Sequence, residues 1–160
     1  MSACGVLHVH SCPPALCPHV AWAVARELGV RVDLSWSAQA AAPGSLRSEC
    51  GWTGRRGTAG RLASALRGWD PLRFEVTEEP GAGCDGQRYS RTPSLGLFAT
   101  STSANGDVMV GEDRLRALLG SGTDLAAGLR LLLGAAWDEE LEPYRRAADR
   151  SPAARLTRVV

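Results

Sequence analysis

The sequence contains no lysine, so all 18 basic residues are arginine, set against 17 acidic residues. The resulting net charge of +1 produces no strong field of one sign, and we therefore expect neither a nucleic-acid partner nor a membrane partner. Guanidinium groups suit anion recognition. The abundance of Ala, Gly and Pro nevertheless indicates the coding bias of a GC-rich genome as the simpler cause.

Long apolar runs are also missing. The most hydrophobic helical stretch, residues 125–137, contains Arg130 and two glycines and is too short to cross a bilayer core of about 30 Å. The N-terminus lacks the basic and apolar regions of a signal peptide. The cysteines are odd in number, which argues against a full disulfide framework: Cys4, Cys12, Cys17, Cys50 and Cys84. We expect a reduced, cytoplasmic setting.

The composition that remains is typical of one globular domain. The 160 residues are 44% hydrophobic and 22% charged, which suffices for a packed core without metals or disulfides. We therefore treat residues 1–160 as a single domain and predict no cofactor.

Hydrophobic periodicity predicts an α+β fold. Alternation predicts strands over 5–10, 31–36, 46–53 and 72–77, and apolar stripes predict helices over 19–28 and from Thr58 to before Pro71. This β-α-β-β-α-β order favours a ferredoxin-like core over residues 1–79. In that core we expect the first and third strands to be adjacent and parallel, with both helices on one face. The other face would carry exposed charges paired across strands: Arg31, Asp33, Arg47, Glu49, Arg73 and Glu75.

Residues 80–142 predict an extension of this core. Strands are expected over 88–92 and 95–101, and Asn105-Gly106 is a strong hairpin signal leading to 107–110. A short helix is predicted over 112–119 and a longer one from Thr123, which Pro143 should end. Residues 143–160 read as a polar tail, with an edge strand as one option near its end.

The histidines and two cysteines cluster in the segment HVHSCPPALCPH. One hypothesis is a zinc site of His10, Cys12, Cys17 and His19, although the spacing has no CxxC pair. Another is a reactive Cys17 thiolate at the start of a helix, with His10 or His19 as its base. The alternative is structural: His8 and His10 lie on the less buried strand face and the cysteines are packing residues.

A glycine- and arginine-rich loop, GWTGRRGTAGR, precedes the second helix and lacks both nucleotide-binding fingerprints. Parallel first and third strands would bring this loop beside the His/Cys segment, with two helix N-termini suited to a phosphate or carboxylate. The predicted ligand-binding residues are His10, Cys17, His19, Arg55, Arg56, Gly57 and Thr58.

The longer helix after Thr123 carries a broad apolar stripe that the charged sheet face cannot cover. This stripe predicts packing on the added strands, on the short helix, or on a second copy of the chain in a homodimer. It consists of Leu125, Leu129, Leu132, Leu133, Ala136, Trp137 and Leu141.

Four segments resemble an actinobacterial domain-of-unknown-function family, number 3145: HVHSCPPALCPHVAWAVARELGVRV, ALRGWDPLRFEVTEEP, DGQRYSRTPSLGLF and AWDEELEPYR. The resemblance spans nearly the whole chain. It implies a stand-alone bacterial cytoplasmic protein and supplies no catalytic residues.

Three functions remain open at this stage. The first is a non-enzymatic regulatory module that binds a small anion or a partner at the two-loop patch, where the His/Cys segment and the glycine- and arginine-rich loop would meet. The second is a metal-binding or thiol-dependent enzyme centred on the His/Cys loop. The third is a structural dimeric interaction protein.

Overall fold

The computed structural model describes residues 2–150 and 157–158 as a mixed α+β fold built on one mostly antiparallel sheet. The strands lie in the order β2-β3-β1-β4-β5-β6-β7, with β8 parallel to β3. Their bounds are β1 Ser2–Cys12, β2 Ser37–Ala38, β3 Leu46–Arg55, β4 Arg73–Glu78, β5 Gly86–Thr92, β6 Gly96–Thr102, β7 Val108–Met109 and β8 Thr157–Arg158.

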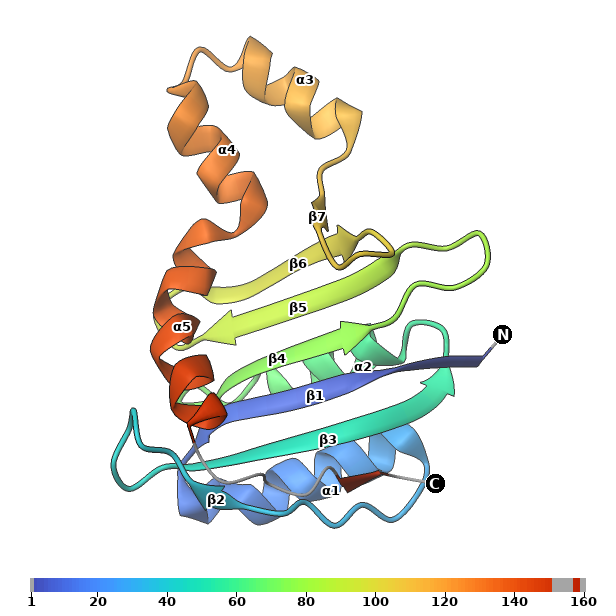
Figure 1. Cartoon of the computed structure of the whole chain (residues 1–160), viewed down its shortest axis with the longest axis vertical. Helices are drawn as coiled ribbons and strands as arrows, with labels where there is room; N and C mark the ends of the chain where they lie inside the picture. The colour runs from blue at the N-terminus through green and yellow to red at the C-terminus, as the bar shows by residue number, and fades with distance from the viewer. Residues whose placement is uncertain (1, 151–156, 159–160) are drawn as a thin grey trace.

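Five α-helices in the described residues occupy three positions around this sheet. Helices α1 and α2 cover one face, α5 crosses the other face at one end of the strands, and α3 and α4 project beyond β6 (Figure 1). The helices are α1 Cys17–Leu28, α2 Thr58–Leu66, α3 Glu112–Gly120, α4 Leu125–Leu133 and α5 Ala135–Asp149, and a short 3-10 turn, Pro14–Leu16, precedes α1.

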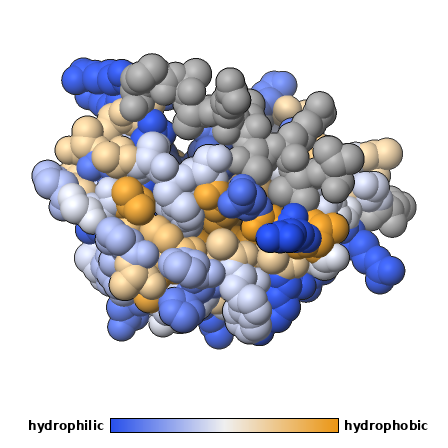
Figure 2. Space-filling model, turned by 90° about the horizontal axis from the view of Figure 1, so that it is seen from below, coloured by the Kyte–Doolittle hydropathy of each residue, from blue (hydrophilic) through white to orange (hydrophobic). Residues whose placement is uncertain are grey.

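The core lies between the sheet and the pair α1 and α2. Strand alternation places Leu7, Trp52 and Phe74 on the helix-facing side, where each is almost fully buried. Val20 of α1 and Leu62 of α2 complete the same cluster. Figure 2, a view from below Figure 1, shows hydrophobic residues interleaved with hydrophilic ones on the outer surface.

The predicted direction of the third strand is wrong. Strand β1 pairs with β3 in antiparallel register, with Ser2 opposite Arg55 and Cys12 opposite Leu46. Helix α1 brings the chain back, and the extended segment that ends in β2 then runs in the same direction as β1. The turn between β2 and β3 reverses the chain, so β3 runs against β1. The C-terminal ends of β1 and β3 therefore lie at opposite ends of the sheet.

The predicted strand over 31–36 is also wrong. Val32 and Leu34 are buried and their neighbours are exposed, as the alternation requires, but this segment forms no strand. Strand β2 comprises just Ser37 and Ala38, which pair with β3. Alternation records which side chains of an extended segment are buried, not whether its backbone pairs.

The second half follows the sequence prediction more closely at first. Strands β5 and β6 pair antiparallel, and the turn at Asn105-Gly106 leads into β7, with Gly106 at a φ of 86°. The predicted long helix, however, breaks into α4 and α5 at Gly134, which adopts a φ of 72°. Helix α5 then continues through Pro143, so residues 143–149 belong to a helix and not to a tail.

In the described part of the chain, none of the helices has the length and apolar character needed to cross a membrane.

Candidate functional site

The seven predicted ligand-binding residues do not form one site. His10 lies on the sheet face under α5, Cys17 is buried in the first turn of α1, and His19 is exposed on α1. Residues 55–58 lie at the other end of the sheet, where β3 runs into α2. The two-loop patch depended on parallel strands, and the antiparallel pairing separates its halves.

The thiol of Cys17 is not activated by its position at the start of α1. Burial raises the pKa of Cys17, although hydrogen bonding to the Cys12 thiol and to the backbone opposes this effect. Burial likewise raises the pKa of Cys12 to about 12. The predicted lowering is wrong because desolvation of the thiolate outweighs the favourable helix N-terminus.

The anion position at the start of α2 is filled by the protein itself. The carboxylate of Glu78 on β4 accepts hydrogen bonds from the backbone N–H groups of Gly57, at 3.1 Å, and Ala59, at 3.2 Å. Arg56 donates to the same carboxylate and to the carbonyl of Glu79. Thr58 was expected to cap the helix, but its hydroxyl instead donates to the carbonyl of Arg55. An external anion would have to displace Glu78.

The predicted zinc ligands also point in different directions. Cys12 and Cys17 are buried in the core on the α1 side, whereas His10 faces α5 on the opposite side of the sheet. Across residues 2–150 and 157–158, no three His, Cys, Asp or Glu side chains are grouped so that they could hold a metal ion.

The structure instead reveals a buried polar cluster between the sheet and α5. Its centre is Glu75, which sequence alternation had placed among exposed charges but which is only 7% exposed. The carboxylate of Glu75 lies 2.7 Å from His10 Nε2 and accepts two hydrogen bonds from the Arg145 guanidinium. The polar cluster is completed on β5 and α5 by Arg88, Ser90 and Asp138.

These contacts keep Glu75 ionised. Burial would raise the pKa of Glu75, but hydrogen bonds and charge from His10 and Arg145 more than offset it and hold the pKa well below its usual range. The same pairing, together with Asp138, outweighs burial at Arg145 and raises the pKa of its guanidinium. The polar cluster therefore fastens α5 to the sheet with a network of opposite charges.

Arg145 was missed because it was assigned to the tail. A helical pattern did contain the signal: Asp138, Leu141 and Arg145 recur at intervals of three and four residues and so share one face of α5. Leu141 is fully buried on that face. Continuing the helix through Pro143 would have placed Arg145 against the sheet.

A pocket of about 250 Å³ adjoins the polar cluster, and we name it the sheet pocket. The strands contribute His8, His10, Arg47 and Glu49, and α5 contributes Arg145 and Asp149. Glu75 also lines this pocket. Seven of its ten lining residues are ionisable and come from β1, β3, β4 and α5, so charged groups from four elements converge here and make it the candidate site for a small polar molecule.

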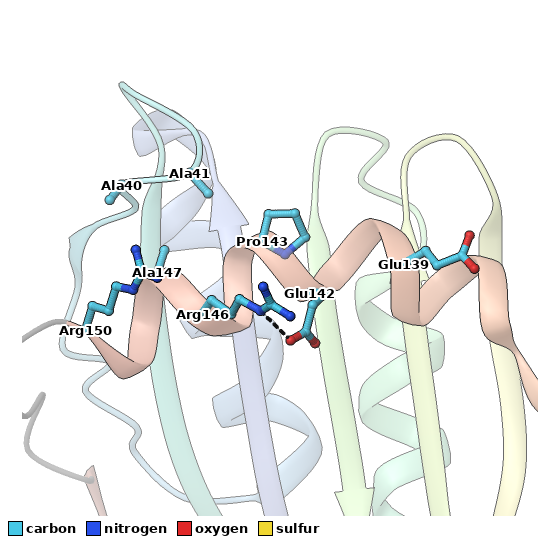
Figure 3. A pocket seen from close by; sticks show the side chains of 8 residues that line it. All are labelled: Ala40, Ala41, Glu139, Glu142, Pro143, Arg146, Ala147 and Arg150. Atoms are coloured by element: carbon cyan, nitrogen blue, oxygen red, sulfur yellow. Dashed lines mark hydrogen bonds and ion pairs between the residues drawn. The ribbon is translucent and has the colours of Figure 1, made fainter.

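A larger groove of about 660 Å³ lies on the outer side of α5, beside Ala40 and Ala41 (Figure 3). Its charged side chains are largely paired with one another or with neighbours: Arg146 donates to Glu142 at 2.8 Å, and Glu139 pairs with Arg130. The groove therefore offers a ligand fewer unpaired polar groups than the sheet pocket does.

Helices α3 and α4 form a second feature, which we name the arm (residues 112–133). None of its residues is buried, and Leu119, Leu125, Leu131 and Leu133 are exposed. Figure 1 shows the arm standing away from the sheet beyond β6. The predicted apolar stripe divides here: Trp137 and Leu141 pack on the sheet side, and the α4 leucines do not.

Comparison with known proteins yields one match. The family described as a protein of unknown function (DUF3145) matches residues 6–158. No curated protein and no solved structure matches the chain.

Proposed function

Because the chain belongs to this DUF3145 family, whose description assigns no function, we propose one from the structure: a non-enzymatic interaction module of regulatory type that self-associates through the arm. The observation that carries this proposal is the exposure of four leucines on two helices that bury nothing. Leu119 is 71% exposed and Leu131 is 64% exposed. Exposed apolar side chains gathered on one projecting element favour an interaction site.

The arm is a built element and not a loose segment. Leu118 of α3 packs against Gly128 of α4 so closely that a Cβ at Gly128 would lie 2.1 Å from a Leu118 methyl group. Asp124 caps α4 by accepting a hydrogen bond from the Ala127 N–H. A preorganised helix pair loses little conformational entropy on association, which favours binding.

The occupant that fits the arm is a second copy of the chain. Its charges are balanced, with three acidic residues (Glu112, Asp113, Asp124) and three arginines (Arg114, Arg116, Arg130), so it does not select a strongly charged partner. Two such helix pairs related by a two-fold axis would form a four-helix arrangement that covers exposed leucines of both helices. This proposal moves the predicted dimer contact from the whole stripe to α3 and α4.

The open edge of strand β6, which lies beside the arm, supports self-association at the same place. Strand β7 pairs with β6 just at Ser101 and Thr102, so Gly96 to Thr100 have no strand partner on that side within the described residues. Open edges of this kind are normally covered. The indole of Trp137 donates to the Gly96 carbonyl and satisfies part of the edge.

We also propose a description of the fold and a cellular location. The order β2-β3-β1-β4, with α1 and α2 on one face, supports a ferredoxin-like description of the first half, with all neighbouring strands antiparallel and not with the parallel first and third strands that we had expected. All five cysteines are free thiols, which supports a reducing, cytoplasmic location. An actinobacterial origin rests on the resemblance alone.

Multi-angle light scattering of the full chain across a concentration series tests self-association. We expect twice the chain mass of 16.9 kDa for the wild type and the mass of one chain for a Leu119→Glu/Leu131→Glu variant. Trp22→Glu is the matched control, because Trp22 is 63% exposed on α1, away from the arm, and this variant should remain a dimer. A wild type that stays monomeric at millimolar concentration would refute the proposal.

A further inference from the structure

The sheet pocket has charges arranged in two rows by the strand register. His8 of β1 lies opposite Glu49 of β3 and Glu75 of β4, which makes a row with two carboxylates. Arg47 lies two residues before Glu49 on β3 and His10 lies two residues after His8 on β1, so these two nitrogen-bearing side chains make a second row in the pocket. Residues two apart on a strand are separated by roughly 6.7 Å.

The groups deepest in the pocket are already satisfied. The guanidinium of Arg145 contacts Glu75, Asp138 and Glu142, and Glu75 receives hydrogen bonds from four side chains in all. Their opposite charges cancel at the back of the pocket. These groups therefore hold α5 over the sheet and define the shape of the pocket, but they do not select a ligand by its net charge.

The groups near the opening remain free to act on a ligand. In the described part of the chain, the side chains of Arg47 and Asp149 form no hydrogen bond or ion pair with another residue. Glu49 has one long contact, 3.7 Å to His8. Burial and the neighbouring His10 lower the pKa of His8 against the raising effect of Glu49, so His8 is mostly neutral at pH 7 and leaves the charge of Glu49 uncompensated.

His10 adds a directed hydrogen-bonding atom. Its ring is only 6% exposed, and Nε2 is engaged by Glu75. Because Nε2 is engaged by this carboxylate, Nδ1 is left for a ligand, as an acceptor in the neutral ring and as a donor in the charged ring, and no described residue hydrogen-bonds it. A buried imidazole held by a carboxylate thus presents one unpartnered nitrogen at the sheet pocket.

We propose that the sheet pocket binds a small zwitterion whose carboxylate faces Arg47 and whose ammonium group faces Glu49, with Asp149 as a further acceptor and His10 Nδ1 as a further hydrogen-bonding atom. A simple anion would meet the carboxylates of Glu49 and Asp149, and a simple amine would meet Arg47. A molecule with both charges satisfies all of them. The spacing of the two rows favours an amino acid with two or three carbons between its charged groups, and about 250 Å³ accommodates a molecule of that size.

Isothermal titration of the full chain with β-alanine and 4-aminobutyrate tests this proposal. Propionate and propylamine, which carry one charge each, are the matched probes. We expect at least one of the zwitterions to bind more tightly than either single-charge probe by about tenfold or more. Absence of heat with both zwitterions at tens of millimolar would overturn the proposal, and so would propionate or propylamine binding as tightly as the zwitterions.

Variants locate the binding. Arg47→Ala and Glu49→Ala should each weaken the zwitterion by about tenfold, because each removes one of two charge pairs. Arg55→Ala removes an arginine at the opposite end of the sheet and should leave the affinity unchanged. Equal affinity in Arg47→Ala and wild type would overturn the proposal, provided that the urea unfolding midpoints agree.

This inference does not depend on self-association. The Leu119→Glu/Leu131→Glu variant changes the arm alone, beyond β6, and should bind the zwitterion with wild-type affinity. Failure of the dimer proposal and failure of the zwitterion proposal therefore give different results.

Discussion

Glu75 and Glu78 lie three residues apart on β4 and face opposite sides of the sheet, yet both carboxylates are buried and ionised. Different partners stabilise each buried carboxylate: side-chain cations and Ser90 at Glu75, and mainly backbone N–H groups at Glu78. A buried charge without such partners would cost several kcal/mol. At the residue scale, these two glutamates connect the sheet to α5 and to α2.

Stability should fall in acid partly through Glu78. Burial would raise the pKa of Glu78, but the N–H groups of Gly57 and Ala59 and the Arg56 guanidinium bring it below the usual value. An unfolded glutamate has a pKa of about 4.3, so the stabilisation is fully present above that pH and is lost as pH falls through the lower folded-state pKa.

The measurement is urea unfolding of wild type and Glu78→Gln from pH 7 to pH 3. Near neutral pH the variant should be less stable by about 1.5–3 kcal/mol, since it loses charge-assisted hydrogen bonds. The difference should shrink as pH falls below about 4. A difference that stays constant over this range would show that Glu78 is not held as a carboxylate.

At the scale of elements, Gly134 determines that α4 and α5 are separate helices. Its φ of 72° ends α4 and begins α5 in a new direction. A Cβ at this position would also lie 2.5 Å from the ring of Phe98 on β6, which itself packs against Trp137. The direction of the arm therefore depends on this glycine.

Gly134→Ala should destabilise the fold by about 1–3 kcal/mol, because a left-handed backbone and a contact with Phe98 act together. Gly122→Ala is the matched control, since Gly122 has a φ of 66° but nothing within 4 Å of an added Cβ. Urea unfolding midpoints measure both variants. If the two lose equal stability, the Phe98 contact contributes nothing.

At the scale of the whole molecule, the sheet separates two environments. The side covered by α1 and α2 is apolar and contains three of the five cysteines, whereas the side crossed by α5 contains the polar cluster and the sheet pocket. This division explains why the His/Cys segment did not yield one site. His10 and Cys12 are two residues apart and would share a face on a regular strand, but the register shift in β1 after Val9 places them on opposite sides of the sheet.

Thiol labelling of the folded chain tests this division. Cys84 is exposed and should react with a disulfide reagent at the rate of a model thiol. Cys12, Cys17 and Cys50 are buried with raised pKa values, and should react only when the chain unfolds. Mass spectrometry of the labelled peptides identifies each site. Rapid labelling of Cys17 in the native protein would restore the thiolate hypothesis.

The sequence by itself determined the local elements. Short-range patterns and turn chemistry predicted helices over 19–28 and from Thr58, which are observed at 17–28 and 58–66, and they also predicted the alternation of β3 and β4 and the turn at Asn105-Gly106. Residue periodicity also indicated correctly which face of β1, β3 and β4 packs on α1 and α2.

Tertiary structure decided the rest, because direction and pairing are long-range properties. The antiparallel return of β3 separated residues 55–58 from His10, and Glu78 occupied the helix N-terminus that the sequence left open for a ligand. Glu75 became buried only when α5 brought Arg145 over it from 70 residues away. A charge on an alternating strand looks solvated until the element that covers it is known.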